Sequence, residues 1–538
     1  MTYIFIFNNT SRAANYGVGT YIQQLSRELS VCPNIVVSFI DMYSEVKEFV
    51  ITNDEQGFRH YQIPASPTGR ESDIYCRCQF YLLARHINVD ATDKIVFHFN
   101  YFHHITLALL LKGHFHECRI VLTVHYMNWC FELNGNLSQF RKFISNGYEP
   151  TNESVKRIIT EYTNEQRFLH FADEVFVLSK KTFSILCEDY KVDSNKLHLI
   201  YNGAGCEPYP NPTKHTSIQN ILFMGRLDEI KGLKYLIGAF EKIASQYPKT
   251  HLTIAGDGNF QPYLKQSRTL QGRITFLGRI QGKDVEDAYH TAHIGVMPSF
   301  HEQCSYTAIE MMRHGIPFIG TDSTGLAEML DATPWLRIHI DEDNFCEEDF
   351  VLQIVDRLDK LLSDKTVYLQ ASSAVSDLYE KRYKSSYMAQ ATITAISTSF
   401  CRMDYALSSD YLSYIDERMK QLVEQQPDID TDFFGISGIA VYLWWRLCNL
   451  QKQVDKDEHK VSLHNVLEQC LLWIQKVLDG HTLPEELMFT LFDMKEKAYN
   501  SPSTNTIWTK YDISQEEVMS LDKKHIIHNA LKICNCKI

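Results

Sequence analysis

Two glutamates frame the start of an apolar helical pattern in SFHEQCSYTAIEMMRHGIPFIG (299–320). Glu302 precedes the predicted helix and Glu310 lies inside it, with seven residues between them. A carboxylate buried among apolar neighbours is strongly destabilising unless it has partners, and sugar or ribose hydroxyls can supply the hydrogen bonds. A solvent-facing Glu310, or one paired with Arg313, would need no ligand. Both interpretations of Glu310 stay open at this point.

The local helix signals favour an anion site next to these glutamates. Ser305 is a favourable N-cap, and Gly315 followed by Pro317 ends the predicted helix, which spans about 306–314. Its N-terminus presents free N–H groups and the positive end of the helix dipole. The preceding apolar run HIGVM (293–297) predicts a strand, and ligands in open α/β sheets bind at the carboxyl ends of strands.

Two cations occupy an equivalent position after another predicted strand. Arg226 and Lys231 in GRLDEIKG follow the strand NILFMG (220–225) and precede a helix. A guanidinium and an ammonium suit a diphosphate. Either cation alone is more simply explained as part of a solvated loop. The glutamates downstream in the same half favour the diphosphate site.

Short β-branched and aromatic runs alternate with helical patterns, which predicts βαβ units and parallel sheets. A stretch with three prolines and two glycines at 202–217 interrupts the alternation and predicts a linker. The expected strands before and after it are 3–7, 35–40, 95–99, 120–124, 174–178 and 197–200, then 220–225, 251–256, 274–278, 293–297, 316–320 and 336–340.

The predicted fold class is α/β, with two tandem doubly wound Rossmann-like domains that face a cleft and a C-terminal, mainly helical extension. Helical sequence at about 347–397 is expected to close the second half. We place the first Rossmann-like domain at 1–208, the second with its closing helices at 209–400 and a helical extension of unknown role at 401–538.

Composition narrows the class of protein. The net charge of −13 argues against a dedicated nucleic-acid or anionic-membrane binder. The beginning MTYIFIFNN resembles a first strand rather than a signal peptide, and no apolar run has the length of a membrane span. The cytoplasm is therefore the expected compartment, with at most peripheral membrane association. The fourteen cysteines are expected to be reduced thiols, since the close pairs Cys76/Cys78 and Cys534/Cys536 lack zinc-knuckle spacing.

With these motifs in order, the sequence resembles glycosyltransferase family 4, the retaining sugar-nucleotide transferases of GT-B architecture. The resemblance covers roughly residues 1–397. The matching elements are GRLDEIKG, Glu302-x7-Glu310 with MMRHGIPFIGTD, STGLAEML (323–330), FADEVFVLSK (171–180) and IYNGAG (200–205).

The resemblance implies that 1–208 is the acceptor-side domain and that 209–400 binds the nucleotide sugar. It also implies a role for each matched residue. Arg226 and Lys231 would hold the donor diphosphate, Glu302 would bind hydroxyls of the transferred sugar, and Glu310 would bind the ribose. His125, after the strand IVLTV, would contact the donor sugar and orient the acceptor, and a satisfied core histidine is the alternative. The catalytic set is therefore His125, Arg226, Lys231 and Glu302. The remaining donor-binding residues are Gly17, Gly19, Gly256, Gly258, Arg279, Ser305, Tyr306, Thr307 and Glu310.

Two departures from the family pattern matter. The family commonly has E-G-F-G where this chain has EQCS, so Gln303 and Cys304 leave the identity of the donor sugar open. A catalytic Cys304 lacks a visible matched base. His98, His103 and His104 cluster in sequence as metal ligands can, but no acidic partner or firm spacing supports a metal site.

The function predicted is retaining transfer of a sugar from a nucleoside-diphosphate donor, with UDP the expected nucleotide, to a hydroxyl of a glycan, lipid-linked or peptide acceptor. No cofactor is expected. No D-x-D pair is placed as a metal clamp, so we expect metal-independent catalysis. The alternative is a non-catalytic sugar-nucleotide-binding partner or sensor with the same fold. A nicotinamide-dependent oxidoreductase is disfavoured, because no G-x-G-x-x-G closes the first strand. Donor base and sugar, acceptor, oligomeric state and the role of 401–538 stay open.

Overall fold

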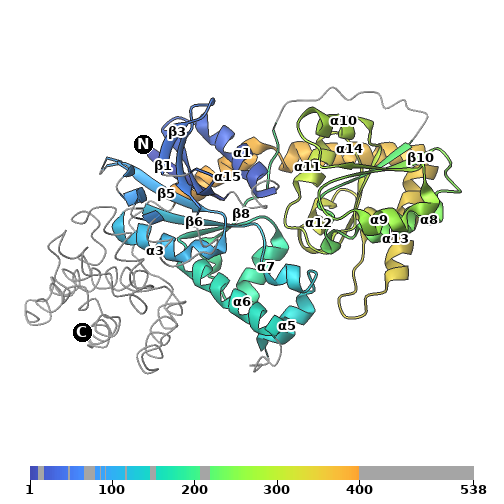
Figure 1. Cartoon of the computed structure of the whole chain (residues 1–538), viewed down its shortest axis with the longest axis horizontal. Coiled ribbons are helices and arrows are strands. Elements are labelled where there is room, and N and C mark those ends of the chain that lie inside the picture. The colour runs from blue at the N-terminus through green and yellow to red at the C-terminus, as the bar shows by residue number, and fades with distance from the viewer. Residues whose placement is uncertain are drawn as a thin grey trace, which may run out of the picture.

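The computed structural model shows two α/β lobes side by side (Figure 1). Each lobe is built on its own sheet, and the strands of the first sheet, β1 to β8, precede those of the second, β9 to β14. The described residues are 1–9, 17–46, 49–65, 79–80, 82–84, 86–90, 92–115, 118–145, 153–205 and 219–398. The predicted extension at 401–538, both close cysteine pairs and most of the predicted linker lie outside the described residues.

The first sheet has the strand order β3-β4-β2-β1-β5-β6-β7-β8 and is parallel except for the β3–β4 pair at one edge. Its inner strands are almost wholly buried, as their continuous apolar sequences predict. The strands are β1 (Thr2–Asn9), β2 (Ile35–Ser44), β3 (Val50–Asn53), β4 (Arg59–Pro64), β5 (Lys94–Phe99), β6 (Cys118–Val124), β7 (Glu174–Val177) and β8 (Leu197–Leu199).

The second sheet is parallel throughout, with the order β11-β10-β9-β12-β13-β14. This is the doubly wound order in which the strand sequence reverses next to the first strand, and ligands bind at that switch point. The strands are β9 (Gln219–Met224), β10 (Thr250–Ala255), β11 (Ile274–Gly278), β12 (Ile294–Met297), β13 (Phe318–Thr321) and β14 (Arg337–Ile338).

Helices cover both sheets, which confirms the predicted α/β class with two doubly wound halves. Three apolar clusters form the cores, two of them on the first sheet and one on the second. In the first lobe the helices are α1 (Gly17–Ser30), α3 (Ile105–His114), α4 (Trp129–Glu132), α5 (Leu137–Ser145), α6 (Glu153–Phe171) and α7 (Lys180–Glu188). After β9 they are α8 (Leu233–Ile243), α9 (Gln261–Gln266), α10 (Lys283–Thr291), α11 (Tyr306–Arg313), α12 (Thr324–Met329), α13 (Glu347–Ser363), α14 (Lys365–Arg382) and α15 (Ser385–Thr398).

The last described helix departs from the expectation that 347–397 closes the second half. Helices α13 and α14 pack in the second lobe, but α15 returns to the first lobe and lies against α1 (Figure 1). Met388 and Ile396 of α15 join an apolar cluster with Ile4 and Val18. Ser385 also donates a hydrogen bond to Glu28 of α1 at 2.6 Å. The domain boundaries at 208/209 and 400/401 stay predictions.

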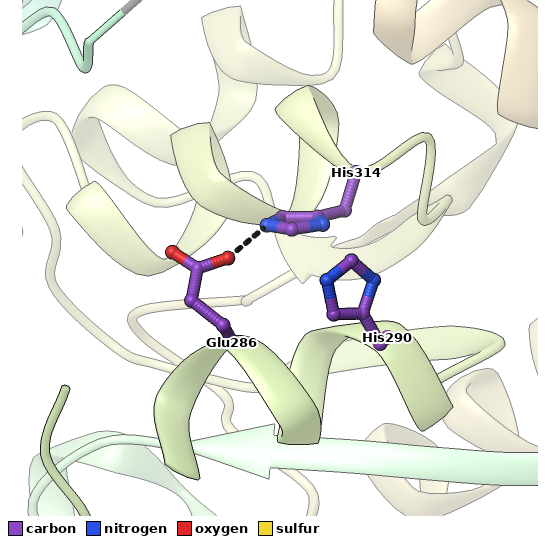
Figure 2. A group of neighbouring side chains, drawn as sticks. All are labelled: Glu286, His290 and His314. Atoms are coloured by element: carbon purple, nitrogen blue, oxygen red, sulfur yellow. Dashed lines mark ion pairs between the residues drawn. The ribbon is translucent and has the colours of Figure 1, made fainter. Parts of the chain in front are cut away.

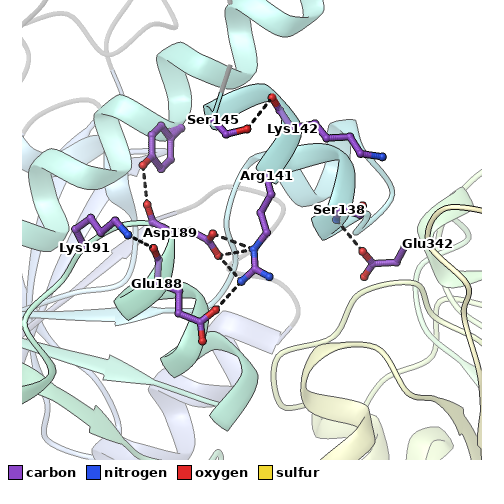
Figure 3. Close-up of polar contacts among 9 residues, drawn as sticks. Ser138, Arg141, Lys142, Ser145, Glu188, Asp189, Lys191 and Glu342 are labelled. Carbon is purple, nitrogen blue, oxygen red and sulfur yellow. Dashed lines mark hydrogen bonds and ion pairs between the residues drawn. The ribbon is translucent and has the colours of Figure 1, made fainter. Parts of the chain in front are cut away.

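The lobes also contact each other through α5 (Figure 3). The backbone N–H of Ser138 donates to Glu342 of the second lobe at 2.8 Å. On the same helix, Arg141 contacts Glu188, the last residue of α7, at 2.8 Å. Arg141 also contacts Asp189, the next residue, at 2.9 Å. These pairs fix α5 on the first lobe, so its N-terminus is positioned to contact the second. Within the described part of the chain, no helix is long and apolar enough to cross a membrane.

Candidate active site

A cavity of about 640 Å³ lies between the lobes, at the carboxyl ends of strands from both sheets. The first lobe contributes the start of α1 and the segment after β6, and the second contributes the loops after β9, β10, β11 and β12. Eleven of the predicted site residues line this cavity: Gly17, His125, Arg226, Lys231, Gly256, Arg279, Glu302, Ser305, Tyr306, Thr307 and Glu310.

The two predicted cations both lie in the loop between β9 and α8. The Arg226 guanidinium pairs with Asp228 at 3.0 Å and lies 5.9 Å from the ring centroid of Phe131, which belongs to the first lobe. Lys231 ends a short 3₁₀ turn (Glu229–Lys231), and Gly232 follows in the left-handed region with a φ of 68°. A Cβ at Gly232 would lie 2.1 Å from the carbonyl oxygen of Pro298, so only glycine fits this turn.

Lys231 and Glu302 form an ion pair in the cavity wall. The Nζ of Lys231 lies 2.5 Å from Oε1 of Glu302, and the two side chains are 18% and 13% exposed. The backbone of Glu302 is also held, because its N–H donates to the hydroxyl of Thr324 at 3.0 Å and its carbonyl accepts from the N–H of Gly325 at 2.7 Å. The lysine is therefore available to an anion in the cavity while its position is set by the carboxylate.

Glu310 is the second acidic group of the site. It lies on α11, whose observed span of Tyr306–Arg313 agrees with the predicted helix to within one residue. The hydroxyl of Tyr289 on α10 donates to Oε2 of Glu310 at 2.6 Å. Desolvation raises the pKa of Glu310 to about 7, although the Tyr289 hydrogen bond acts in the opposite direction. A half-buried carboxylate with a further oxygen to satisfy is suited to bind a hydroxyl.

The N-terminus of α11 faces the same cavity. Ser305 has extended backbone angles as an N-cap, and its side chain makes no capping hydrogen bond. The residues at this end, Ser305, Tyr306 and Thr307, all line the cavity. The uncapped amides and the dipole of the helix therefore add a positive potential to that of Arg226 and Lys231.

His125 is a neutral histidine with a defined tautomer. Asn100 donates through Nδ2 to the carbonyl of Phe7 at 3.0 Å, so its Oδ1 is the atom that accepts from Nε2 of His125 at 2.9 Å. Nδ1 of His125 is then the unprotonated nitrogen. Burial lowers the pKa of His125 to about 3, so the ring is an uncharged hydrogen-bonding group at neutral pH.

Two glycines shape the loop after β10. A Cβ at Gly256, whose φ is +154°, would lie 1.7 Å from the carbonyl oxygen of Gly225. A Cβ at Gly258 would lie 2.8 Å from Cβ of Leu227. The two loops therefore pack backbone to backbone. Neither Gly258 nor Gly19 is among the residues lining the cavity, and their roles as site residues stay predictions.

The departure at EQCS has a structural explanation. Oε1 of Gln303 accepts hydrogen bonds from the hydroxyls of Ser179 and Thr182 in the first lobe. Asn202 donates to the carbonyl of Cys304 at 2.6 Å. These side chains join the lobes where the family has a smaller residue. Burial raises the pKa of the Cys304 thiol, which keeps it protonated and disfavours a nucleophilic role.

The histidine cluster of the first lobe lies apart from this cavity. His98 is buried, contacts the hydroxyl of Thr123 at 2.7 Å, and has its pKa lowered to about 3 by burial. His103 lies 3.1 Å from Nδ2 of Asn9, and His104 is buried. In the described part of the chain, none of these three histidines enters a group of three ligands that could hold a metal.

Sequence reasoning missed three contributors to the cavity or its support. Tyr289 fixes Glu310 from 21 residues away, and nothing in its local sequence signals this. Phe131 lines the cavity from the other lobe. His301, next to Glu302, could have been suspected from that adjacency, and burial lowers its pKa to about 4.

Two family models match consecutive parts of the chain. The family model described as "Glycosyltransferase Family 4" matches residues 16–207, and the model "Glycosyl transferases group 1" matches residues 218–364. The two matches thus cover the two lobes in order.

A relative among curated proteins is the phosphatidylinositol N-acetylglucosaminyltransferase gpi3 subunit of Schizosaccharomyces pombe, 24% identical over 68% of this chain and 76% of its own. The chain spans about half the length of two other curated relatives, at 49% and 54%. Among solved structures, sucrose-phosphate synthase of Thermosynechococcus elongatus has a TM-score of 0.58 and 17% identity, covering 74% of this chain and 99% of that one. HepE of Anabaena, in complex with UDP, has a TM-score of 0.54 and 14% identity, with 74% and 100% covered. These two structures share the GT-B fold with this chain.

Proposed function

This chain belongs to glycosyltransferase family 4, and from this membership we propose that it transfers a glycosyl group from a nucleoside-diphosphate sugar to an acceptor hydroxyl, with retention at the anomeric carbon. One observation carries the proposal. Arg226, Lys231, the N-terminus of α11 and the carboxylates of Glu302 and Glu310 converge on a single cavity between the lobes.

Each group has a part in binding the donor. Arg226, Lys231 and the first amides of α11 bind the diphosphate, which is the only strongly anionic part of such a donor. Glu310 binds the ribose, because it lies one helical turn deeper on α11 and is held by Tyr289. Glu302, beside Lys231, binds hydroxyls of the transferred sugar. UDP is the proposed nucleotide, and the complex of the HepE fold neighbour with UDP supports it.

The chemical step exchanges one bond at the anomeric carbon for another on the same face. The bond from this carbon to the leaving phosphate oxygen breaks, and a bond to the acceptor oxygen forms. The acceptor proton passes to the leaving phosphate. Arg226, Lys231 and the α11 dipole stabilise the negative charge that develops on the diphosphate. Glu302 is already paired with Lys231, and it serves as a hydroxyl ligand rather than as a covalent nucleophile.

His125 and the first lobe orient the reaction. His125 contributes an uncharged ring at the cavity wall, which suits hydrogen bonding to sugar or acceptor hydroxyls. The second lobe holds the nucleotide, so the acceptor enters from the side of the first lobe. We propose a glycan, lipid-linked or peptide acceptor. Contacts between the lobes exclude water from the donor and limit its hydrolysis.

The test is a donor and acceptor screen with the whole chain. Purified protein is incubated with a panel of sugar nucleotides, and release of nucleoside diphosphate and transfer to acceptors are both measured. Arg226→Ala and Glu310→Ala are compared with Arg268→Ala and Glu241→Ala, which change exposed residues of the second lobe outside the cavity. We expect turnover to fall about 100-fold or more in Arg226→Ala, while the two control variants keep wild-type rates.

Three outcomes are informative. Undiminished turnover in Arg226→Ala and Glu310→Ala would remove the proposed site. Tight UDP binding without transfer or hydrolysis across the panel would favour the alternative of a non-catalytic sugar-nucleotide sensor. A product of inverted anomeric configuration would contradict retention while leaving the donor site intact.

A further inference from the structure

Two histidines and a glutamate meet outside the donor cavity, on its α10–α11 side (Figure 2). Glu286 and His290 lie one turn apart on α10, and His314 lies at the C-terminal end of α11. Residues four apart on a helix share a face, so the α10 pair is presented together toward α11. None of the three side chains lines the donor cavity.

The geometry of this cluster is that of converging ligands. Nε2 of His314 lies 3.1 Å from Oε2 of Glu286. The rings of His290 and His314 stand nearly perpendicular, with centroids 5.3 Å apart. One ligand atom from each of the three residues lies within 4.8 Å of the other two. His314 is buried and the other two residues are half-buried, and Oε2 of Glu286, Nδ1 of His290 and Nε2 of His314 are themselves shielded from solvent.

We propose that Glu286, His290 and His314 form a binding site for a Zn²⁺-like transition metal ion. Two imidazoles and one carboxylate are a ligand set typical of zinc, which takes four ligands and can leave one position to water. Ligand atoms bound tetrahedrally to zinc lie about 3.3 Å apart, so closure by about 1.5 Å would complete the site. Small side-chain rotations of the half-buried Glu286 and His290 provide this closure. Magnesium, which prefers six oxygen ligands, fits poorly.

Packing around the cluster restricts the ring of His314. Tyr289 stacks on His314 with centroids 5.2 Å apart and an interplanar angle of 19°. The same tyrosine donates its hydroxyl to Glu310, one turn before His314 on α11. A metal ion joining Glu286 and His290 to His314 would therefore clamp α10 to α11, the two helices that carry the Tyr289–Glu310 pair.

A metal ion bound at this cluster would also affect the geometry of the donor site. Holding α10 against α11 fixes the distance between Tyr289 and Glu310, so Zn²⁺ and UDP should favour each other's binding. This consequence rests on the proposed function, because it assumes that Glu310 binds the nucleotide. The metal site itself does not depend on that assumption.

The binding test uses the whole chain, freed of metal with a chelator and then titrated with Zn²⁺. Because cysteines elsewhere can also bind zinc, Co²⁺ is titrated in parallel. Cobalt bound by nitrogen and oxygen shows only visible d–d bands, whereas thiolate ligands add a near-ultraviolet charge-transfer band. The test variants are Glu286→Gln, His290→Gln and His314→Gln. The matched control is His339→Gln, which removes an exposed histidine that also pairs with a carboxylate, Asp322, at 2.6 Å.

We expect the wild type and His339→Gln to bind one equivalent of Zn²⁺ with the same affinity. Each of the three test variants should bind this equivalent about ten-fold or more weakly. Zn²⁺ should raise the Tm of the wild type and the control but not that of the test variants, and Mg²⁺ should not replace it. The Tm of each metal-free variant shows whether it is folded, and Glu286→Gln is the mildest change because its side chain is half-buried.

Equal zinc affinity in all variants, or no thiolate-free Co²⁺ spectrum in the wild type, overturns the proposal. UDP titrations with and without Zn²⁺ then test the coupling. If the metal binds at these residues but UDP affinity does not change, the coupling is wrong and the metal site stands. If UDP does not bind in either state, the failure lies with the proposed function instead.

Discussion

The hydroxyl of Tyr289 lies 2.6 Å from Oε2 of Glu310 and joins α10 to α11 beside the donor cavity. This single contact orients the carboxylate that we assign to the ribose. It also connects the cavity to the Glu286–His290–His314 cluster, because Tyr289 stacks on His314. Tyr289 contacts Glu310 directly, and His314 supports the site by packing on Tyr289.

Tyr289→Phe tests this support. The phenylalanine keeps the packing on His314 but removes the only donor that the tyrosine offers to Glu310. A hydrogen bond to a charged group contributes about 1.5–3 kcal/mol, so donor KM should rise about ten-fold or more with a smaller change in kcat. Steady-state kinetics measure this. An unchanged KM would show that Glu310 is positioned without Tyr289.

Substitution of the two cavity carboxylates, Glu302 and Glu310, should affect the binding of different parts of the donor. In Glu302→Gln, Lys231 loses its ion pair and is free to bind phosphate, so UDP should bind as well as or better than in the wild type. Transfer should fall about 100-fold, because the sugar hydroxyls lose their negatively charged acceptor and the amide keeps only one neutral acceptor oxygen. Glu310→Gln should weaken UDP itself. Calorimetric titration with UDP and turnover with the complete donor distinguish the two. The same UDP affinity in both variants would contradict the assigned roles.

Gly325→Ala should disturb the Glu302 loop. A Cβ at Gly325 would lie 1.5 Å from the carbonyl oxygen of Gln303, so the 302–305 loop would have to move. We expect a loss of about 2 kcal/mol or more in the free energy of unfolding, together with weaker donor binding. Gly238→Ala in α8 is the control, because the nearest atom to its Cβ would be 3.7 Å away. That variant should be as stable as the wild type or slightly more stable. Chemical denaturation of both variants checks the difference.

Glu165 should give the first lobe a pH-dependent stability. It is fully buried, and contacts the N–H of Asn128 at 2.6 Å and the hydroxyl of Tyr190 at 2.5 Å. Burial raises the pKa of Glu165 to about 8. The folded state therefore holds one more proton than the unfolded state between about pH 4.5 and 8. Its contribution to stability is complete below this window and declines as the pH rises through it, by roughly 1 kcal/mol per pH unit.

Glu165→Gln replaces the ionisable carboxyl group with an amide that does not titrate, so the variant lacks this pH-dependent contribution. The Tm of the variant relative to the wild type should therefore rise steadily from pH 5 to pH 8. Glu153→Gln, an exposed change at the start of the same helix, should show a constant difference. A constant difference in Glu165→Gln as well would mean that the carboxylate is already ionised in the folded protein at pH 5.

Much of the fold could be predicted because parallel strands buried on both faces need continuous apolar runs. The strand predicted at 274–278 has the observed bounds, and α11 ends within one residue of its prediction. The edge strand β3 and its neighbour β4 were missed. The β3 sequence VITN is short and partly exposed, as an edge strand can be. The β4 sequence RHYQIP is paired on both sides but alternates polar and apolar residues, so it lacks the continuous apolar signal.

The two lobes, their ligand-binding ends and the principal charged residues of the cavity could be inferred from the amino-acid sequence, because strand periodicity, helix caps and loop position are local properties. The three-dimensional packing was needed to show which distant side chains meet. It brought Tyr289 to Glu310, Gln303 to the first lobe, α15 back onto α1, and Glu286 and His290 to His314. These contacts depend on how helices cross over a sheet and on how two lobes dock. No local pattern encodes those distances, since they arise from the packing of the whole chain.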